Sequence, residues 1–178
     1  MSIKKKRIVI LTELELKKTL SRLTSEIIEK VTNLDNLLLV GIPTRGIDLS
    51  EVIEKELFSK TGLKIRRGII DPTLYRDDHN RVGTRVIKAT DIPIPIEKQE
   101  ILLIDDVIYT GRTIRAAMDA LYSWGRPKRV MLLVMVDRGH RELPIQPDFC
   151  GKKVPTRKNE SISLRLNNVD NEEGIFLE

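Results

Sequence analysis

The 178 residues suit one domain with a full hydrophobic core, and 40% apolar and 32% charged residues argue against a disordered or membrane-embedded chain. The single Cys150 excludes an internal disulfide framework, and no clustered Cys and His residues predict a structural zinc site. No apolar stretch approaches membrane-spanning length, so we expect a cytoplasmic protein without a membrane partner. The net charge is +5, with basic residues concentrated in residues 1–22 and 138–158, which permits nucleic-acid binding without requiring it.

The first predicted helix begins after Thr12. Thr12 and Glu15 have the spacing of a capping box, in which each side chain accepts from a backbone N–H of the other. An apolar stripe at helical spacing follows: Leu16, Leu20, Leu23, Ile27 and Val31. Residues 33–36 end this helix, and the continuous apolar run of residues 37–42 predicts a buried strand.

A second helix and a second strand come next. Apolar residues at helical spacing face a sheet and stop before Gly62: Ile47, Val52, Ile53 and Leu57. Residues 64–70 predict a strand. Residues 71–98 are the least regular part and contain three prolines. Irregular segments of this length are often functional lids or contain a hairpin.

The pattern of strand, helix and strand then repeats. Residues 101–104 predict a strand and residues 129–136 another, separated by an amphipathic helix that stops at Gly125. Because strands and helices alternate, we expect an α/β fold with a central parallel sheet flanked by helices. The turns at residues 41–46, 105–113 and 137–139 follow strands, so they should converge at one ligand-binding edge.

An acidic pair follows the strand at residues 101–104. Asp105 and Asp106 are succeeded by Thr110, Gly111 and Thr113 at the start of a helix, where unpaired N–H groups and the helix dipole favour a phosphate. The alternative is that Asp105 and Asp106 only cap the helix, without binding a ligand. The whole pattern favours a sugar phosphate, with amides binding the phosphate and carboxylates binding the ribose hydroxyls.

The turn at residues 41–46 has the composition of an anion-binding loop. Gly41 and Gly46 let backbone N–H groups approach an anion, Thr44 adds a hydroxyl, and Arg45 adds a permanent cation. The alternative is an ordinary strand-to-helix turn. The expected position of residues 41–46 at the ligand-binding edge of the sheet favours the anion-binding role.

Residues 101–113 resemble the 5-phosphoribosyl-1-pyrophosphate (PRPP) motif of the type I phosphoribosyltransferases. The resemblance implies that the acidic pair contacts the ribose and that the next loop wraps the 5′-phosphate. It also makes residues 41–46 similar to that family's pyrophosphate loop, where an unusual cis peptide is expected, with Ile42–Pro43 the candidate because only proline makes cis inexpensive. The implied cofactor is Mg²⁺, held mainly by PRPP and water, without a dedicated protein metal site.

Residues 71–78 resemble the start of the same family's flexible catalytic loop. Arg76 is expected to reach the departing pyrophosphate, whereas Asp77 and Asp78 are expected to be solvated carboxylates and no role is assigned to His79 or Arg85. The implied catalytic residues are Asp105, Asp106 and Arg76. The implied substrate-binding residues add the two loops and one later arginine: Thr44, Arg45, Val107, Tyr109, Thr110, Gly111, Arg112, Thr113 and Arg138.

Residues 136–145 and 148–156, with residues 73–78, resemble the PyrR family, whose members attenuate transcription of pyrimidine operons and have uracil phosphoribosyltransferase activity. The resemblance implies one domain over residues 1–178, with a lid at about 71–98 and a small hood over the base at about 137–158. The expected reaction converts uracil and PRPP to UMP and diphosphate. His140 is expected to be structural.

The resemblance also implies RNA binding across a homodimer or higher homo-oligomer. The candidate positions are Arg22, Lys30, Arg141 and Lys152, and the implied partner is a pyr mRNA leader. Ser25 and Gln146 stand where the family pattern has His and Arg. A phosphoribosyltransferase without RNA regulation, a purine phosphoribosyltransferase and a non-catalytic nucleotide-binding scaffold are the alternatives.

Overall fold

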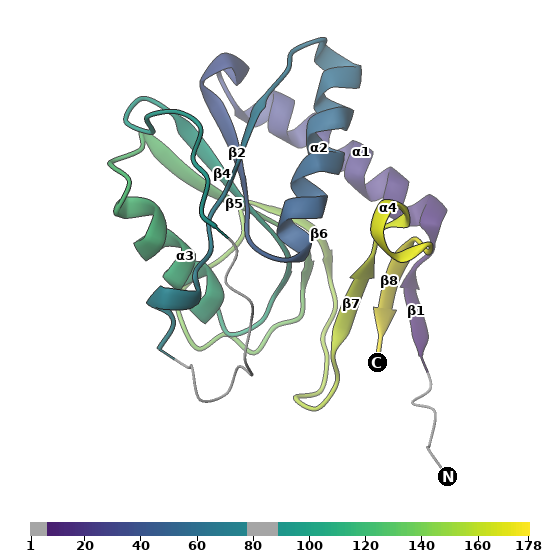
Figure 1. Ribbon diagram of the computed structural model, residues 1–178. Coiled ribbons are helices and arrows are strands. Elements are labelled where there is room, and N and C mark those ends of the chain that lie inside the picture. Colours follow the sequence, from purple (N-terminus) through teal and green to yellow (C-terminus); the bar gives the residue numbers. More distant parts are fainter. Residues whose placement is uncertain (1–6, 78–88) are drawn as a thin grey trace.

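Two sheets carry the fold in the computed structural model, which describes residues 7–77 and 89–178 (Figure 1). The larger sheet has five parallel strands in the order β3-β2-β4-β5-β6. Its elements, in chain order, are β2 (Leu37–Gly41), α2 (Arg45–Thr61), β3 (Arg66–Ile69), β4 (Glu100–Ile108), α3 (Arg112–Tyr122), β5 (Arg129–Asp137) and β6 (Phe149–Lys153). This arrangement confirms the expected α/β fold with a central parallel sheet.

Helices cover both faces of the larger sheet. Helix α1 (Glu13–Lys30) lies with α2 on one face, and α3 lies on the other (Figure 1). Alternate residues of each strand serve the two cores: in β4, Leu102 and Ile104 pack toward α1 and α2, whereas Ile101 and Leu103 pack toward α3. Two buried faces explain why these strands are continuously apolar.

The smaller sheet joins the two ends of the chain. Strands β1 (Ile8–Leu11), β7 (Ile162–Arg165) and β8 (Gly174–Leu177) pair antiparallel in the order β1-β8-β7, beside α1 (Figure 1). The guanidinium of Arg7 stacks 3.5 Å from the centre of the Phe176 ring and pairs with Glu172 at 2.9 Å. A short helix, α4 (Asn167–Asp170), connects β7 to β8. The sequence patterns did not predict this sheet.

Two short 3₁₀ turns complete the elements, η1 (Leu34–Asn36) before β2 and η2 (Thr73–Tyr75) after β3. The predicted capping box is confirmed at the start of α1: the Glu15 N–H donates to the Thr12 hydroxyl, and the Thr12 N–H donates to the Glu15 carboxylate at 2.8 Å. Within the described residues, no helix has both the length and the apolar character needed to span a membrane.

The strand that carries the acidic pair is longer than predicted. Strand β4 does not end at Ile104 but continues through the pair to Ile108, because its ladder with β5 still joins Asp105 to Val134 and Ile108 to Asp137. The range expected as a hood is residues 137–158. This range contains β6, which is the edge strand of the larger sheet, parallel to β5.

Candidate active site

A cleft of about 270 Å³ opens where β4 meets α3. Its lining includes Asp105 and the loop of residues 109–113. Gly111 has a positive φ of 92° and lies directly before α3, so the loop turns sharply and brings the N-terminus of the helix to the cleft. The hydroxyl of Thr110 accepts from the N–H of Arg112 at 3.3 Å. An anion in this cleft would lie at the positive end of the α3 dipole.

The acidic pair straddles the edge of the sheet. Because side chains alternate along a strand, Asp105 follows Leu103 toward the α3 side and Asp106 follows Ile104 toward the α2 side. Asp105 lines the cleft, accepts from the Asp106 N–H at 3.0 Å, and is buried. The two neighbouring carboxylates therefore lie on opposite faces of the sheet, and Asp105, but not Asp106, is among the residues that line the cleft.

The environment of Asp106 disfavours its charged form. Desolvation raises the pKa of Asp106 above its ordinary value, although hydrogen bonds from neighbouring groups and the positive charge of Arg45 oppose the change. The N–H of Val107 donates to this carboxylate at 2.8 Å. The ionised form of a carboxyl group held in this way becomes more favourable when a positive charge develops beside it.

The loop after β2 is packed tightly against the rest of the sheet. A Cβ atom on Gly46 would lie only 2.2 Å from the carbonyl oxygen of Ile104, and one on Gly41 would lie 2.7 Å from the carbonyl oxygen of Gly46. Both glycines are therefore required by close packing, Gly46 against β4 and Gly41 against the loop itself. Thr44 is exposed at the start of α2.

The cis peptide of this loop lies one bond later than predicted. It joins Pro43 to Thr44, so the assignment to Ile42–Pro43 is wrong. The sequence argument depended on the low cost of cis bonds that precede proline, and a bond that follows proline has no such signal.

Arg45 is held by two carboxylates. Its Nη1 atom lies 3.2 Å from Asp48 on the same helix, and its Nη2 atom lies 2.5 Å from Asp170 in α4. Asp170 was not among the predicted site residues. Its separation of 125 residues from Arg45 leaves no signal in local spacing.

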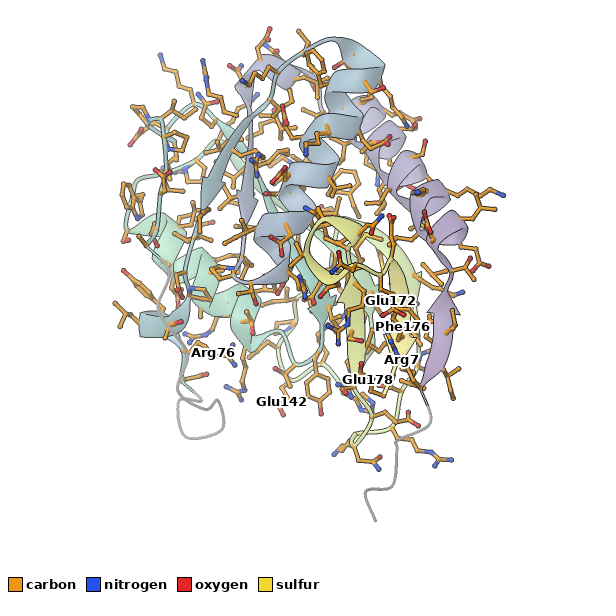
Figure 2. All side chains as sticks on the ribbon, turned by 45° about the vertical axis from the view of Figure 1, so that its right-hand side comes forward. Arg7, Arg76, Glu142, Glu172, Phe176 and Glu178 are labelled. Carbon is orange, nitrogen blue, oxygen red and sulfur yellow. The ribbon has the colours of Figure 1, made fainter. Side chains whose placement is uncertain are left out.

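The described start of the lid meets the phosphate loop. Arg76 donates to the Thr113 hydroxyl at 2.6 Å, and Arg112 pairs with Asp77 and Glu142, each at 2.7 Å. Figure 2 shows Arg76 and Glu142 to the left of Arg7 and Phe176, which lie at the small sheet. Glu142 is a further cleft residue that sequence reasoning missed. The lid residues Asp78, His79 and Arg85 lie outside the described residues.

A second cavity, of about 360 Å³, lies at the carboxyl ends of β5 and β6. It is lined by Asp137, Arg138, Gly139, His140, Lys153, Val154, Pro155 and Thr156. The buried Arg138 donates to the Thr156 hydroxyl at 3.1 Å, and its guanidinium lies 4.2 Å from the centre of the Tyr109 ring. His140 meets the same ring edge-on at 5.6 Å, with its Nε2 atom 2.6 Å from the Thr156 carbonyl oxygen. Tyr109 therefore connects the phosphate loop to this cavity.

Arg141, predicted for RNA, lies between the cleft and the second cavity. It donates to the Tyr109 carbonyl at 2.8 Å and to the Ile145 carbonyl at 2.9 Å, and it pairs with Asp137 at 2.6 Å. Its side chain is only 14% exposed. This geometry fastens the phosphate loop to the end of β5 and leaves little of the guanidinium for an external partner.

The other three RNA candidates lie together beside β6. Arg22 donates to the carbonyl of Gly151 at 2.7 Å, Lys30 to that of Asp148 at 3.3 Å, and Lys152 to that of Ile10 at 3.4 Å. All three are exposed. The structure thus separates one candidate, Arg141, from a surface that the other three share.

Hard oxygen ligands at the cleft are few. Among residues 7–77 and 89–178, no group of three or more His, Cys, Asp or Glu side chains could hold a metal ion. Asp105 and Asp106 supply carboxylate oxygens at the sheet edge. This donor set fits Mg²⁺ that keeps several waters and is held largely by substrate phosphates.

Comparisons with known proteins agree with the geometry. Residues 9–166 match the family described as phosphoribosyl transferase domain. A protein named Bifunctional protein PyrR from Microcystis aeruginosa is 48% identical over 170 residues, which cover 96% of each chain. The protein of that name from Listeria monocytogenes is 47% identical over 176 residues, which cover 97% of this chain and 96% of the relative.

Solved structures share the fold at low identity. A hypoxanthine phosphoribosyltransferase from Staphylococcus aureus matches with a TM-score of 0.68 and 19% identity, covering 95% of this chain and 90% of the other. One from Trypanosoma cruzi matches with a TM-score of 0.72 and 16% identity, covering 94% and 92%. These matches show the type I phosphoribosyltransferase fold, and the close relatives along nearly the whole chain show that this protein belongs to the PyrR family.

Proposed function

We propose that this protein is a cytoplasmic uracil phosphoribosyltransferase that converts uracil and PRPP to UMP and diphosphate. The observation that carries the proposal is the cleft itself, in which the N-terminus of α3 and the carboxylate of Asp105 lie within reach of one ligand. A phosphorylated ribose needs this combination, because its phosphate is an anion and its hydroxyls are hydrogen-bond donors.

The reaction breaks the bond between C1′ of the ribose and a diphosphate oxygen. A new bond forms between C1′ and N1 of uracil, and the N1 proton passes to water. Positive charge grows on the ribose ring as the first bond lengthens, and Asp105 and Asp106 stabilise it from the two sides of the sheet edge. No nucleophilic side chain is required.

The two ends of PRPP bind to different loops. The 5′-phosphate is held by the hydroxyls of Thr110 and Thr113 and by the first N–H groups of α3. Val107 and Gly111 complete the cleft wall around it. Thr44 and Arg45 hold the diphosphate, to which Arg76 adds a positive charge when it leaves Thr113. Mg²⁺, when bound with PRPP, neutralises part of the negative charge on the leaving group.

Uracil occupies the second cavity. Arg138 and His140 line this cavity and both contact the ring of Tyr109, and the backbone of residues 153–156 provides hydrogen-bonding groups. The connection through Tyr109 brings the base toward C1′ of a ribose bound in the cleft.

Product detection with PRPP, Mg²⁺ and single bases tests the proposal. Uracil should yield UMP, whereas hypoxanthine and guanine should yield no nucleotide above the no-enzyme control. Nucleotide formation from a purine alone would assign the protein to the purine alternative. Absence of product with every base would support a non-catalytic scaffold.

A second function is supported by the name of the relatives, which calls them bifunctional, and by the shared surface of Arg22, Lys30 and Lys152. We propose that this surface, in a homodimer or higher homo-oligomer, binds a pyr mRNA leader and that UMP in the cleft strengthens the binding. Phosphate contacts of these cations supply affinity that falls steeply with salt.

Filter binding to the leader RNA, with and without UMP at fixed salt, tests this second function. Arg22→Gln should weaken binding, whereas the exposed Lys98→Gln, outside the proposed surface, should not. Salt-insensitive or absent binding would leave the enzyme as the sole function.

A further inference from the structure

The carboxylate of Asp170 lies between two arginines from different parts of the fold. It accepts from Arg45 Nη2 at 2.5 Å, from Arg165 Nη1 at 3.2 Å and from the Leu166 N–H at 2.9 Å. Its side chain is only 9% exposed. Helix α4, which connects two strands of the small sheet, therefore makes a part-buried, charged contact with the first residue of α2.

Asp170 remains ionised in this position. Although burial opposes ionisation, the Leu166 N–H and the guanidinium groups of Arg165 and Arg45 lower the pKa of Asp170 below its ordinary value. The positive charge of Arg165 offsets the carboxylate on the side of the small sheet. Asp170 therefore bridges one cation at the start of α2 and one at the end of β7.

Two carboxylates fix the plane of the Arg45 guanidinium. Asp48 contacts Nη1 and Asp170 contacts Nη2. Asp48 is on the same helix as Arg45 and moves with it, whereas Asp170 ties the group to a separate sheet. A guanidinium has five N–H donors, so donors remain for an incoming phosphate while both carboxylates stay bound.

The fixed group has a defined place in the site. Arg45 begins α2 within the tightly packed turn at residues 41–46, and its positive charge opposes the rise in the pKa of Asp106 on the same side of the sheet. A cation already oriented toward a phosphate loses less conformational freedom when the phosphate binds. Without Asp170, the long Arg45 side chain would sample several rotamers.

We infer that Asp170 is a positioning residue that orients Arg45 for the diphosphate of PRPP. The inference rests on the proposed function, since it takes the turn at residues 41–46 as the diphosphate site. It adds that the small sheet at the end of the chain serves the reaction, through one carboxylate that does not itself touch the substrate.

Steady-state kinetics of Asp170→Asn, with Arg165→Gln as the matched control, test the inference. Asparagine keeps an acceptor for the Leu166 N–H but removes the charge that orients Arg45. We expect KM for PRPP to rise about 10-fold, as for loss of one charge-assisted contact, with KM for uracil unchanged. Arg165→Gln removes the other arginine and leaves the pair of Asp170 with Arg45, so its KM for PRPP should stay within about 2-fold of the parent protein.

A longer acid supplies a second variant if Asp170→Asn does not fold. Asp170→Glu keeps the charge but displaces the guanidinium, and an intermediate KM for PRPP is expected. Equal losses in Asp170→Asn, Asp170→Glu and Arg165→Gln, or parent-like KM values in both Asp170 variants, would overturn the inference. Either result would leave Asp170 as a structural residue of the small sheet.

An Arg45→Gln background separates this inference from the proposed function. Asp170→Asn should add nothing to Arg45→Gln, because the two residues act through one contact. Titration of the parent protein and Asp170→Asn with magnesium pyrophosphate gives a readout that needs no turnover, and the variant should bind about 10-fold more weakly. Weaker binding without any UMP synthesis by the parent protein would reject the proposed reaction alone, whereas UMP synthesis with unchanged pyrophosphate binding would reject the role of Asp170.

Discussion

The two sides of the site at the carboxyl end of β4 are built from the chain in different ways. On the α3 side, Asp105, the phosphate loop and the start of α3 come from one continuous segment, residues 105–113. On the α2 side, Asp106 lies near Arg45, which Asp170 holds from a separate sheet. One half of the site is thus encoded locally, and the other half exists only after distant segments have packed.

The largest effects are expected from the acidic pair, which belongs to both sides. Asp105→Asn and Asp106→Asn each remove a carboxylate that stabilises the positive ribose, so kcat for UMP synthesis should fall about 100-fold, as for loss of one preorganised electrostatic group. Single-turnover and steady-state rates measure the change. Near-normal kinetics in one of the two variants would show that only the other aspartate takes part in the chemistry.

Stability measurements control for unfolding of Asp106→Asn. Desolvation raises the pKa of Asp106 above its ordinary value of 3.8, so the folded protein binds this proton more tightly than the unfolded chain does. The carboxyl therefore contributes stability at pH values below 3.8 that is lost as the pH rises through the raised pKa. Asp106→Asn has no carboxyl group to ionise at this position, so it does not lose stability in this way as the pH rises. The variant should be at least as stable as the parent protein to urea at pH 7.

Gly46→Ala tests the close packing of the start of α2 against β4. The new Cβ would lie 2.2 Å from the Ile104 carbonyl oxygen, so α2 must shift away from β4. Overpacking of this kind should lower the free energy of unfolding by about 3 kcal/mol, measured by urea denaturation. In the control Gly62→Ala, nothing lies within 4 Å of the new atom, and the left-handed backbone with φ of 73° alone should cost about 1 kcal/mol.

Local patterns in the sequence predicted the α3 side well. The apolar strand, the acidic pair and the small residues before α3 are neighbours in the chain, and the parallel sheet followed from the alternation of strands and helices. The end of β4 was misplaced because the ladder with β5 continues through Asp105, and carboxylates at the end of a strand do not by themselves terminate pairing.

The α2 side could not be predicted in the same way. The contact of Arg45 with Asp170 and the pairing of β1 with β8 join residues more than 100 positions apart, which no local periodicity reveals. Arg141 shows the reverse problem. A charged residue in a basic segment was predicted to face RNA, yet its guanidinium is enclosed by Tyr109, Asp137 and Ile145.

Arg141→Gln tests whether the α3 side also depends on a distant support. Loss of the contacts to the Tyr109 carbonyl and Asp137 should loosen the phosphate loop and the second cavity together. We expect kcat/KM to fall about 10-fold for both PRPP and uracil, as for loss of one charged hydrogen-bonding group. Arg22→Gln, on the exposed surface beside β6, should leave both values unchanged. An Arg141 variant that lost only RNA affinity would return this residue to the RNA surface.

The smallest effect is expected at the start of α1, where the structure is as local as the sequence suggested. Thr12→Ala removes the hydroxyl that accepts from the Glu15 N–H and should lower the free energy of unfolding by about 1 kcal/mol. Hydrogen bonds from the Thr12 N–H and hydroxyl lower the pKa of Glu15 below its ordinary value, so their contribution is present at neutral pH and is lost as the pH falls through the lowered pKa. The difference in stability between the parent protein and Thr12→Ala should therefore narrow in acid. A difference that is constant from pH 7 to pH 3 in urea denaturation would show that the Thr12 hydroxyl contributes only as the acceptor for the Glu15 N–H.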